Sequence, residues 1–221
     1  MNQIICTVDV ALLTLAEDGL KVGLLRRERE PFKSVAALPG GYIHQESDND
    51  ARDAARRVLM DKAGIDPPYL EQLATFSGPA RDPRGWSVSI AYYALVPAQL
   101  LEQAGERGMT LASADHPPQL PFDHRAIVAA AVARLRSKSQ YSSLPCHLAG
   151  ETFTLPQLQK VYETLMNEPL NKVSFRRKMT EMDMLDPVEG RLESAGAHRP
   201  AQVYRLKAAF RDELQLLERG L

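Results

Sequence analysis

Apolar and polar positions in the first half of the chain follow two different periods. Two β-rich runs come first, IICTVDVALLTL and LKVGLLRR, and because a turn around Asp18 and Gly19 separates them we expect a hairpin. Residues 50–62 then place apolar side chains at 51, 54, 55, 58 and 59, which is the stripe of an amphipathic helix. Gly64 follows its last turn and prolines stand at 67 and 68, so the helix is expected to end there.

The rest of this half continues the alternation of strand and helix. The run WSVSIAYYALV is expected to form a strand, whereas residues 99–121 are polar and contain prolines. A helical run, AIVAAAVARLRSK, starts near Asp123. This order of elements predicts an α/β domain over residues 1–138.

A change of pattern marks the second half. Ser, Pro and Gly interrupt both periods in residues 139–150, where we expect a linker. Thr154 then precedes Leu155 and Pro156, which is typical of a helix start with a hydroxyl N-cap and a proline in the first turn. The apolar stripe of this helix consists of Leu158, Val161, Tyr162 and Leu165.

A second helix and a strand complete residues 151–221. After the break NEPLN, a helix is expected whose apolar positions are Val173, Phe175, Met179, Met182 and Leu185, with Pro187 ending it. The alternating run AQVYRLK suggests a closing strand. Two helices across a tight turn followed by a strand hairpin predict a winged helix-turn-helix domain.

Composition and charge narrow the classes of protein that remain. Hydrophobic residues make up 44% and charged residues 25% of the 221 residues, a profile typical of globular proteins rather than disordered ones. Basic and acidic residues nearly cancel, 27 against 28, which excludes a globally basic nucleic-acid binder but permits a local basic patch.

Two further features concern the cellular compartment. Cys6 and Cys146 lie far apart and no C-x-x-C motif occurs, so neither a disulfide framework nor a thiolate zinc site is indicated, and a reducing cytoplasm fits best. The first residues lack a basic region and meet Glu17 and Asp18 before a membrane-spanning length is reached, so we expect neither a signal peptide nor a membrane helix.

The run LPGGYI, with the amphipathic helix that ends in KAGI, resembles the Nudix box of diphosphate hydrolases. That family reads G, five residues, E, seven residues, then R-E-U-x-E-E-x-G-U, where U is a bulky aliphatic residue. Anchored on Gly64, the pattern retains Arg57, but Val58, Asp61 and Lys62 stand where the three helix glutamates belong. The interval from Gly41 to Arg57 is also two residues longer than in the family.

The loss of carboxylates predicts a loss of hydrolysis. Cleaving a pyrophosphate requires Mg²⁺ held by several oxygen ligands, and Lys62 among them would repel the cation. A lysine can instead neutralise a ligand's phosphate. We therefore expect a nucleotide-diphosphate pocket that has lost, or nearly lost, metal-dependent hydrolysis. We expect it to need no cofactor or metal and assign no catalytic residue, while residual ADP-ribose pyrophosphatase activity remains open. The alternative is a nucleoside-diphosphate-sugar pyrophosphatase whose metal ligands include Glu46, Asp48 or Asp50.

The segment RDPRGWSVSIAYY, residues 81–93, resembles the corresponding segment of ADP-ribose-directed Nudix proteins. Its arginines can pair with a diphosphate and its aromatic residue can stack on adenine, although a solvated basic turn with Trp86 capping the core remains open. We read Asp123 as an N-cap beside an exposed His124 and assign no catalysis to either. The expected ADP-ribose contacts are Arg27, Gly40, Gly41, Arg57, Lys62, Arg81, Arg84, Trp86 and Ser89.

Residues 169–180 carry four cations and no acidic residue. On a helix, Lys172 and Arg176 share one face, which suits arginine contacts to guanine and lysine contacts to phosphate, although a merely solvated face remains open. Residues of the following loop are expected to act as a wing. The expected DNA contacts are Thr154, Asn171, Lys172, Ser174, Arg176, Arg177, Lys178, Arg191, His198 and Arg199.

The segments FTLPQLQKVYETLMNEPLNKVSFRRKMTEMDML and HRPAQVYRLK resemble the C-terminal winged helix of the Nudix-related transcriptional regulators, NrtR. With the degenerate Nudix half, the resemblance covers almost the whole chain. It implies a homodimeric repressor of NAD metabolism genes that binds operator DNA and responds to ADP-ribose or a related nucleotide. A protein-interaction scaffold remains a third class, and such a scaffold would show no salt-dependent DNA binding.

Overall fold

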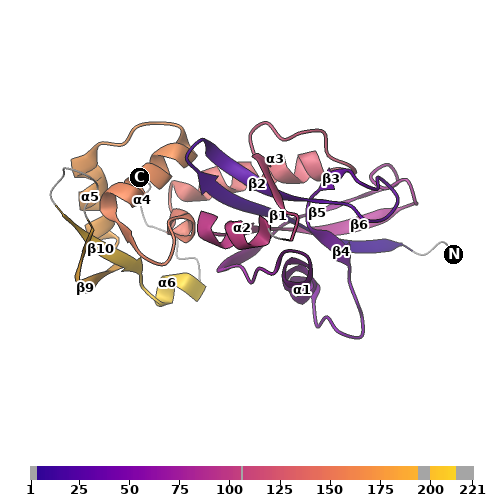
Figure 1. Ribbon diagram of the computed structural model, residues 1–221, viewed down its shortest axis with the longest axis horizontal. Coiled ribbons are helices and arrows are strands. Elements are labelled where there is room, and N and C mark those ends of the chain that lie inside the picture. Colours follow the sequence, from indigo (N-terminus) through magenta and orange to yellow (C-terminus); the bar gives the residue numbers. More distant parts are fainter. Residues whose placement is uncertain (1–3, 106, 194–199, 213–221) are drawn as a thin grey trace. The chain divides into compact units, whose positions relative to one another are not determined.

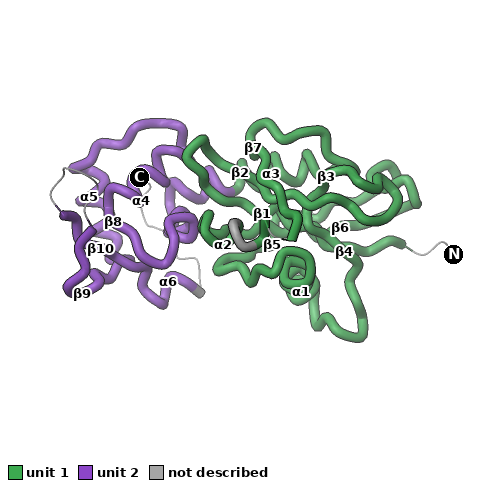
Figure 2. Tube along the Cα trace, in the orientation of Figure 1, with its two compact units in different colours: residues 1–134 green, residues 135–221 purple. Residues whose placement is uncertain are grey.

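The computed structural model describes residues 4–105, 107–193 and 200–212. The chain divides into two compact units, residues 1–134 and 135–221 (Figure 2). This division falls inside the helix α3 (His124–Ser139) and so differs from the predicted linker at residues 139–150. Residues of that segment form the short 3-10 helix η1 (Leu144–Leu148), whose side chains are buried and add Cys146 to the core of the second unit.

The first unit is built on a seven-stranded sheet whose main strand order is β3-β2-β1-β6-β5. The central strands β1 and β6 run parallel, and the β1–β2 hairpin is antiparallel as predicted. Two short strands extend the sheet, with β4 pairing β1 and β7 pairing β2. The strands are β1 (Ile5–Ala16), β2 (Gly19–Arg26), β3 (Ala36–Ala37), β4 (Gly40–Tyr42), β5 (Tyr69–Gly78), β6 (Ser87–Leu95) and β7 (Thr110–Ser113).

Helices cover both faces of this sheet (Figure 1). On one face, α1 (Ala51–Ala63) packs its predicted apolar stripe against Val8, Val10 and Leu12 of β1. On the other, Arg134 of α3 donates to Glu71 of β5, which also accepts from Tyr93 of β6. Because both faces are covered, β1 is buried along most of its length, as its apolar run requires.

Helix α1 begins and ends where the sequence predicts. Asp50 is the N-cap and accepts from the backbone N–H of Asp53, while Gly64 closes the helix in the left-handed region at φ 69°. The polar stretch 99–121 contains two elements that its composition concealed, α2 (Ala98–Gly105) and β7. Strand β5 also lacks a sequence prediction, because its outward positions are polar.

The second unit contains a three-stranded sheet of order β8-β10-β9 and a pair of helices. Thr154 and Gln157 form a reciprocal capping box at the start of the first helix, and Asn167 closes it in the left-handed region. The elements are β8 (Phe153–Thr154), α4 (Leu155–Met166), α5 (Lys172–Glu181), β9 (Leu185–Glu193), β10 (Ala201–Leu206) and α6 (Ala209–Asp212).

The second helix is shorter than predicted. Helix α5 ends at Glu181, and Leu185 and Pro187 belong to β9, which pairs with β10 through Leu206 and Tyr204. The apolar period continues across this junction because Met184 turns into the same core as Phe175. Within the described ranges, no helix is both long and apolar enough to cross a membrane.

Candidate functional sites

A buried carboxylate organises the first unit near the sheet's centre. Asp9 of β1 is 7% exposed, and its Oδ2 accepts from the Ser89 hydroxyl at 2.7 Å and from Arg81 Nη2 at 3.4 Å. Its Oδ1 lies 3.4 Å from Nε2 of His124. Burial alone would raise the pKa of Asp9, but His124, Ser89 and Arg81 together hold that pKa below its ordinary value. Asp9 is therefore an internal anion with three compensating partners.

His124 links this anion to the chain after β3. The Nδ1 atom of His124 accepts from the backbone N–H of Leu38 at 3.1 Å, so the proton of the neutral ring belongs on Nε2, which faces Asp9. The histidine is only 2% exposed, and the prediction of an exposed His124 is wrong. Asp123, the residue before His124, pairs with Arg81 in a bidentate arrangement, and both nitrogen–oxygen distances are 2.9 Å.

Gly40 permits β4 to approach Asp9 closely. A Cβ atom on Gly40 would lie 2.0 Å from Asp9 Oδ1 and 2.9 Å from the carbonyl oxygen of Val8, distances that no side chain tolerates. Gly41, the next residue, faces Val58 of α1, whose Cγ2 would be 3.1 Å from an added Cβ. The Gly-Gly pair therefore brings the backbone of β4 against both β1 and α1.

Three cations lie close to one another beside β4. Burial, followed by repulsion from Arg84, lowers the pKa of Arg27. The ammonium of Lys62 lies against the Gly40 carbonyl oxygen, and although the residue as a whole is exposed, desolvation there and repulsion from Arg27 lower its pKa. We call Arg27, Lys62 and Arg84 the cation cluster. Because its members repel one another in a partly dry setting, a bound anion such as a diphosphate would stabilise it.

Aspartate and aromatic side chains hold the cation cluster in place. Asp82, 2% exposed, accepts from the side chain of Arg84 at 2.6 and 3.0 Å, and Arg84 also donates to the Tyr42 hydroxyl at 2.5 Å. Arg27 lies 4.7 Å from the centroid of the Phe122 ring. Tyr42 and Trp86 are 49% and 48% exposed, which leaves aromatic surface for stacking.

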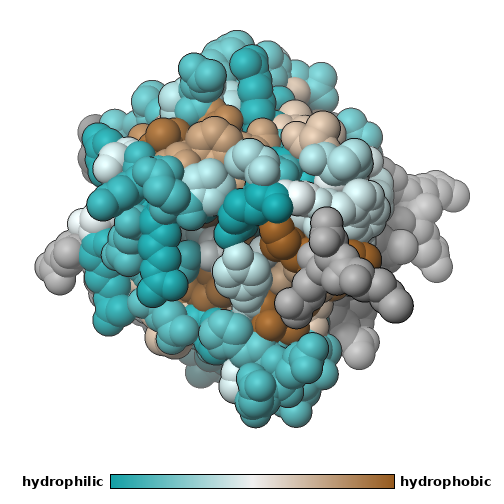
Figure 3. Space-filling model, turned by 90° about the vertical axis from the view of Figure 1, so that its right-hand side faces the viewer, coloured by the Kyte–Doolittle hydropathy of each residue, from teal (hydrophilic) through white to brown (hydrophobic). Residues whose placement is uncertain are grey.

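Apolar surface is visible at one end of the first unit. Figure 3 views the unit from the end at which Figure 1 labels β4, and hydrophobic patches there are interleaved with hydrophilic side chains.

Some of the predicted ligand contacts lie elsewhere. Arg81 is 6% exposed at its side chain and is fully engaged by Asp123, Asp9 and Ser87, and Ser89 is completely buried with its hydroxyl on Asp9. Both are internal supports of the site rather than surfaces offered to a ligand.

Arg57 also has an internal partner. It pairs with Asp48 through two contacts of 2.7 Å and donates to the Tyr42 carbonyl oxygen at 3.0 Å, which ties the loop before α1 to that helix. The Arg57 hydrogen bonds lower the pKa of Asp48 from 3.8 to about 2. Of the predicted set, Lys62, Arg84 and Trp86 are exposed, whereas Arg27, Gly40 and Gly41 are half-buried.

Two of the three carboxylates that a pyrophosphatase would use here, Asp48 and Asp50, are engaged within the protein. Val58 is buried at 2%, Lys62 brings a positive charge onto the Gly40 carbonyl, and Asp48 is paired with Arg57. Asp50 is occupied as the N-cap of α1. Among the residues that the structure describes, no group of three or more His, Cys, Asp or Glu side chains is placed to hold a metal ion.

Helix α5 presents the cationic surface of the second unit. Phe175 and Met179 are 3% exposed and face the core, whereas Lys172, Ser174, Arg176 and Arg177 are exposed. Val173, predicted to serve the core, is 75% exposed instead. Lys178 is half-buried.

Two residues predicted to contact DNA, Thr154 and Asn171, are N-caps of helices α4 and α5. Thr154 is 5% exposed and its hydroxyl belongs to the capping box of α4, while Asn171 Oδ1 accepts from the N–H groups of Val173 and Ser174. Arg191 lies in β9 with an exposed side chain 3.7 Å from Glu193. His198 and Arg199, predicted to act in the wing, lie outside the described residues.

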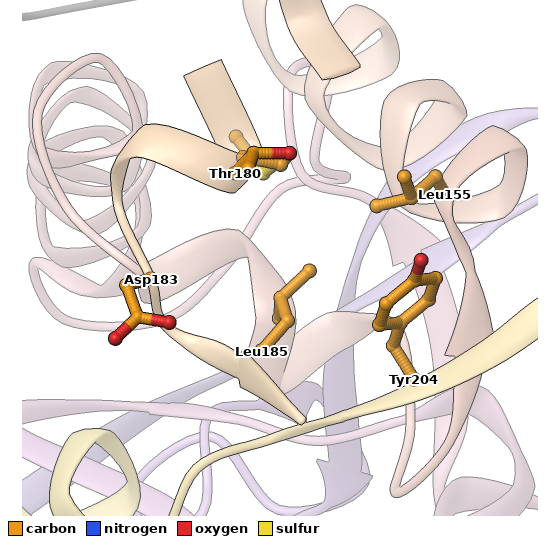
Figure 4. Close-up of a pocket in the computed structure, with 6 residues that line it drawn as sticks. Leu155, Thr180, Asp183, Leu185 and Tyr204 are labelled. Atoms are coloured by element: carbon orange, nitrogen blue, oxygen red, sulfur yellow. The ribbon is translucent and has the colours of Figure 1, made fainter. Parts of the chain in front are cut away.

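A cavity of about 210 Å³ lies within the second unit (Figure 4). Figure 4 shows Leu185 and Tyr204 pointing toward Leu155, with the Asp183 carboxylate turned away, where it pairs with Lys207 at 2.7 Å. The lining of this cavity contains a carboxylate but no cation, and this composition disfavours a phosphate ligand. The lining residues are Leu155, Met179, Thr180, Asp183, Leu185 and Tyr204.

Sequence reasoning missed the carboxylates that pair with the arginines of residues 81–84. Asp9 is a lone carboxylate inside the apolar run TVDVALL, and that interruption is the pattern that could have singled it out. Asp82 and Asp123 look like ordinary turn and cap residues in the sequence. Their pairing with Arg84 and Arg81 depends on the fold.

Fold and site together define a Nudix-type α/β/α unit with a cation-lined site, joined to a winged helix. The family model of the NrtR DNA-binding winged helix domain matches residues 145–206. The chain is 39% identical over 204 residues to the ADPR-responsive transcriptional repressor NtrR of Acinetobacter baylyi, which covers 90% of this chain and 80% of that protein. This chain belongs to the NrtR family of Nudix-related transcriptional regulators, and the predicted fold class is confirmed.

Solved structures agree with this assignment. NrtR of Shewanella oneidensis in complex with a 27mer DNA matches with a TM-score of 0.90 at 35% identity, covering 98% of this chain and 99% of that chain. The Nudix domain of the same protein in complex with ADP ribose matches with a TM-score of 0.52 at 33% identity, covering 61% of this chain and 90% of that chain.

Replacing Gly40 with alanine tests the close approach of β4 to Asp9. We expect Gly40→Ala to lower the free energy of unfolding by about 1–3 kcal/mol, because the added methyl group overlaps Asp9 and the Val8 carbonyl. Urea denaturation measures the change. Gly105→Ala is the matched control, since its Cβ would meet nothing within 4 Å, and equal losses in both variants would contradict the account.

The Asp48–Arg57 pair predicts a pH-dependent stability difference. The folded pKa of Asp48 is about 2 against an ordinary 3.8, so the pair stabilises the fold above pH 4 and loses this contribution as the pH falls toward 2. Asp48→Asn should therefore be less stable than the wild type at pH 5, and the difference should shrink on acidification. Urea denaturation at pH 5, 4 and 3 measures it, and a difference independent of pH would refute the interpretation. Asp66→Asn, which breaks an exposed pair with Arg56, is the control and should change little.

Proposed function

We propose that this protein is a transcriptional repressor that binds operator DNA through its winged helix and releases it when ADP-ribose occupies the Nudix-type unit. The observation that carries the proposal is the presence, in one chain, of a cation cluster supported by buried carboxylates and of an exposed cationic helix α5. The first suits a diphosphate and the second suits the phosphates and base edges of DNA.

The similarity to NrtR proteins supports both halves of the proposal. The Acinetobacter relative is named as an ADPR-responsive repressor, and the Shewanella NrtR structures contain a 27mer DNA in one case and ADP ribose in the other. By extension, we propose that the target genes belong to NAD metabolism and that the protein acts as a homodimer in the cytoplasm. A dimer with two recognition helices calls for half-sites about one helical turn apart, or a multiple of it.

Helix α3 supplies a route by which the effector can alter DNA affinity. Asp123, which directly precedes α3, pairs with Arg81, and His124, the first residue of α3, lies 3.4 Å from Asp9. The same helix continues past Arg134 into the second unit, where Arg136 donates to the Leu165 carbonyl oxygen at 3.0 Å at the end of α4. A ligand that changes the position of α3 therefore acts on both units, and the coupling is limited by its differential affinity for the two states.

We further propose that ADP-ribose acts as an effector without magnesium and is not hydrolysed. Support comes from the Nudix helix, on which Val58 and Lys62 replace metal-binding carboxylates, and from Asp48, which is committed to Arg57. The competing function is an ADP-ribose pyrophosphatase, for which Glu46 and Asp61 are the remaining exposed carboxylates nearby.

Fluorescence anisotropy tests the proposal directly. A labelled DNA fragment from upstream of NAD biosynthesis genes is titrated with protein at fixed salt, with and without ADP-ribose. We expect sequence-specific binding that ADP-ribose weakens by about 5–150-fold and that also falls steeply with rising salt. The absence of specific, salt-dependent binding would favour the scaffold or the hydrolase.

Matched variants of one helix assign the effector response to the cation cluster. Lys62→Met should raise the ADP-ribose concentration needed for half-release by about tenfold or more, because a charge-assisted contact to phosphate is lost. Arg52→Met removes an exposed cation from the same helix α1 and should leave the response unchanged. Equal effects of the two substitutions would contradict the assignment.

An assay for AMP release separates the effector from the substrate. Wild-type protein incubated with ADP-ribose and Mg²⁺ is expected to release no AMP at ordinary enzyme rates, because Lys62 opposes metal binding in the helix face where the family has glutamates. Magnesium-dependent turnover that is lost in Asp61→Asn would instead establish the pyrophosphatase.

A further inference from the structure

The outward face of α5 is not the one on which Lys172 and Arg176 lie. The buried residues Phe175 and Met179 define the side of the helix that faces the core. At about 100° per residue, the direction opposite them falls on Arg177, with Val173 one turn earlier. Lys172 and Arg176 lie closer to the buried edge, so Val173 and Arg177 form the centre of the exposed face.

Val173 is the most exposed of the large hydrophobic residues that stand out on the described surface. Its exposed fraction is 75%, against 61% for Leu192 and 57% for Ile4. It lies in the first turn of α5, and Asn171 caps that turn by accepting from the N–H groups of Val173 and Ser174 at 3.0 Å. The side chain is thus held outward at a fixed position, among cations and with no acidic residue from 169 to 180.

These surroundings specify the partner. A second protein surface rich in apolar groups would have to bury the neighbouring cations, whereas DNA neutralises them and offers an apolar group of its own. The 5-methyl group of thymine is the only apolar substituent on the base edges in the major groove. The first residues of the second helix are those that approach the base edges in helix-turn-helix complexes.

We propose that Val173 is a specificity-determining residue that contacts the methyl group of a thymine in each operator half-site, with Arg177 directed at the neighbouring base pair. The inference rests on the proposed DNA-binding function. Arg177 is available for this contact because its pairing with Glu181 is 3.6 Å long and both side chains are largely exposed, at 76% and 60%.

Deoxyuridine substitution tests the contact, because it removes only the methyl group. The operator is first located by footprinting on the upstream fragment, and each thymine is then replaced in turn by deoxyuridine. For wild-type protein we expect one position in each half-site at which the affinity falls about fourfold, the value for one buried methyl group. Val173→Ala should bind the thymine operator about fourfold more weakly and no longer distinguish thymine from deoxyuridine at that position.

Controls separate this contact from other roles of Val173. Val173→Thr retains one methyl group and should keep part of the discrimination, while Leu111→Ala, which shortens an exposed leucine of β7 in the first unit, should leave it unchanged. Equal losses by Val173→Ala on thymine and deoxyuridine operators would overturn the inference. So would specific binding by the wild type that is indifferent to deoxyuridine at every position. If no fragment is bound specifically, the proposed function itself fails, and that result is distinct from the other two.

Discussion

A charged carboxylate buried in the central strand is the constraint on which the first unit depends. An uncompensated Asp9 would cost several kcal/mol, so the fold must supply partners wherever it is placed. Those partners are Arg81 from the segment before β6, Ser89 from β6 itself and His124 from the start of α3. Gly40 completes the arrangement because only a glycine can lie beside the carboxylate. The position of β4, and with it the cation cluster, follows from the compensation of one buried charge.

This constraint explains the division of labour among the polar residues. Arg81 and Ser89 make their hydrogen bonds to other groups of the protein. Arg84 is held by Asp82 and Lys62 by the Gly40 carbonyl oxygen, while Arg27 lies over the Phe122 ring. On α1, Val58 and Lys62 stand where the Nudix pattern has glutamates, and Lys62 lies against the Gly40 carbonyl oxygen. Three cations therefore lie beside β4, and Asp123, which pairs with Arg81, directly precedes α3, the helix that continues into the second unit.

The sequence predicts what depends on local pattern and fails where the outcome depends on distant partners. The β1–β2 hairpin, the limits of α1 and the pair α4 and α5 follow from periodicity, caps and turn residues. The domain division within α3 could not be predicted, because a helix that belongs to two units has an uninterrupted pattern. His124 and Val173 were misplaced for a related reason, since burial depends on what packs opposite a residue and not on its type. Arg81 carries the same charge as Arg84, and it is its position among Asp123, Asp9 and Ser87, which only the fold brings together, that makes it an internal residue.

We propose that one equilibrium connects ADP-ribose binding in the first unit to DNA binding by α5 in the second. Linkage is reciprocal, so the factor by which ADP-ribose weakens operator binding must also be the factor by which operator DNA weakens ADP-ribose binding. Isothermal titration of ADP-ribose into the free protein and into the operator-saturated protein measures the second factor. The account predicts weaker ADP-ribose binding in the presence of operator DNA, by the same factor that anisotropy yields for the reverse effect. An ADP-ribose affinity that is identical with and without operator DNA would contradict it.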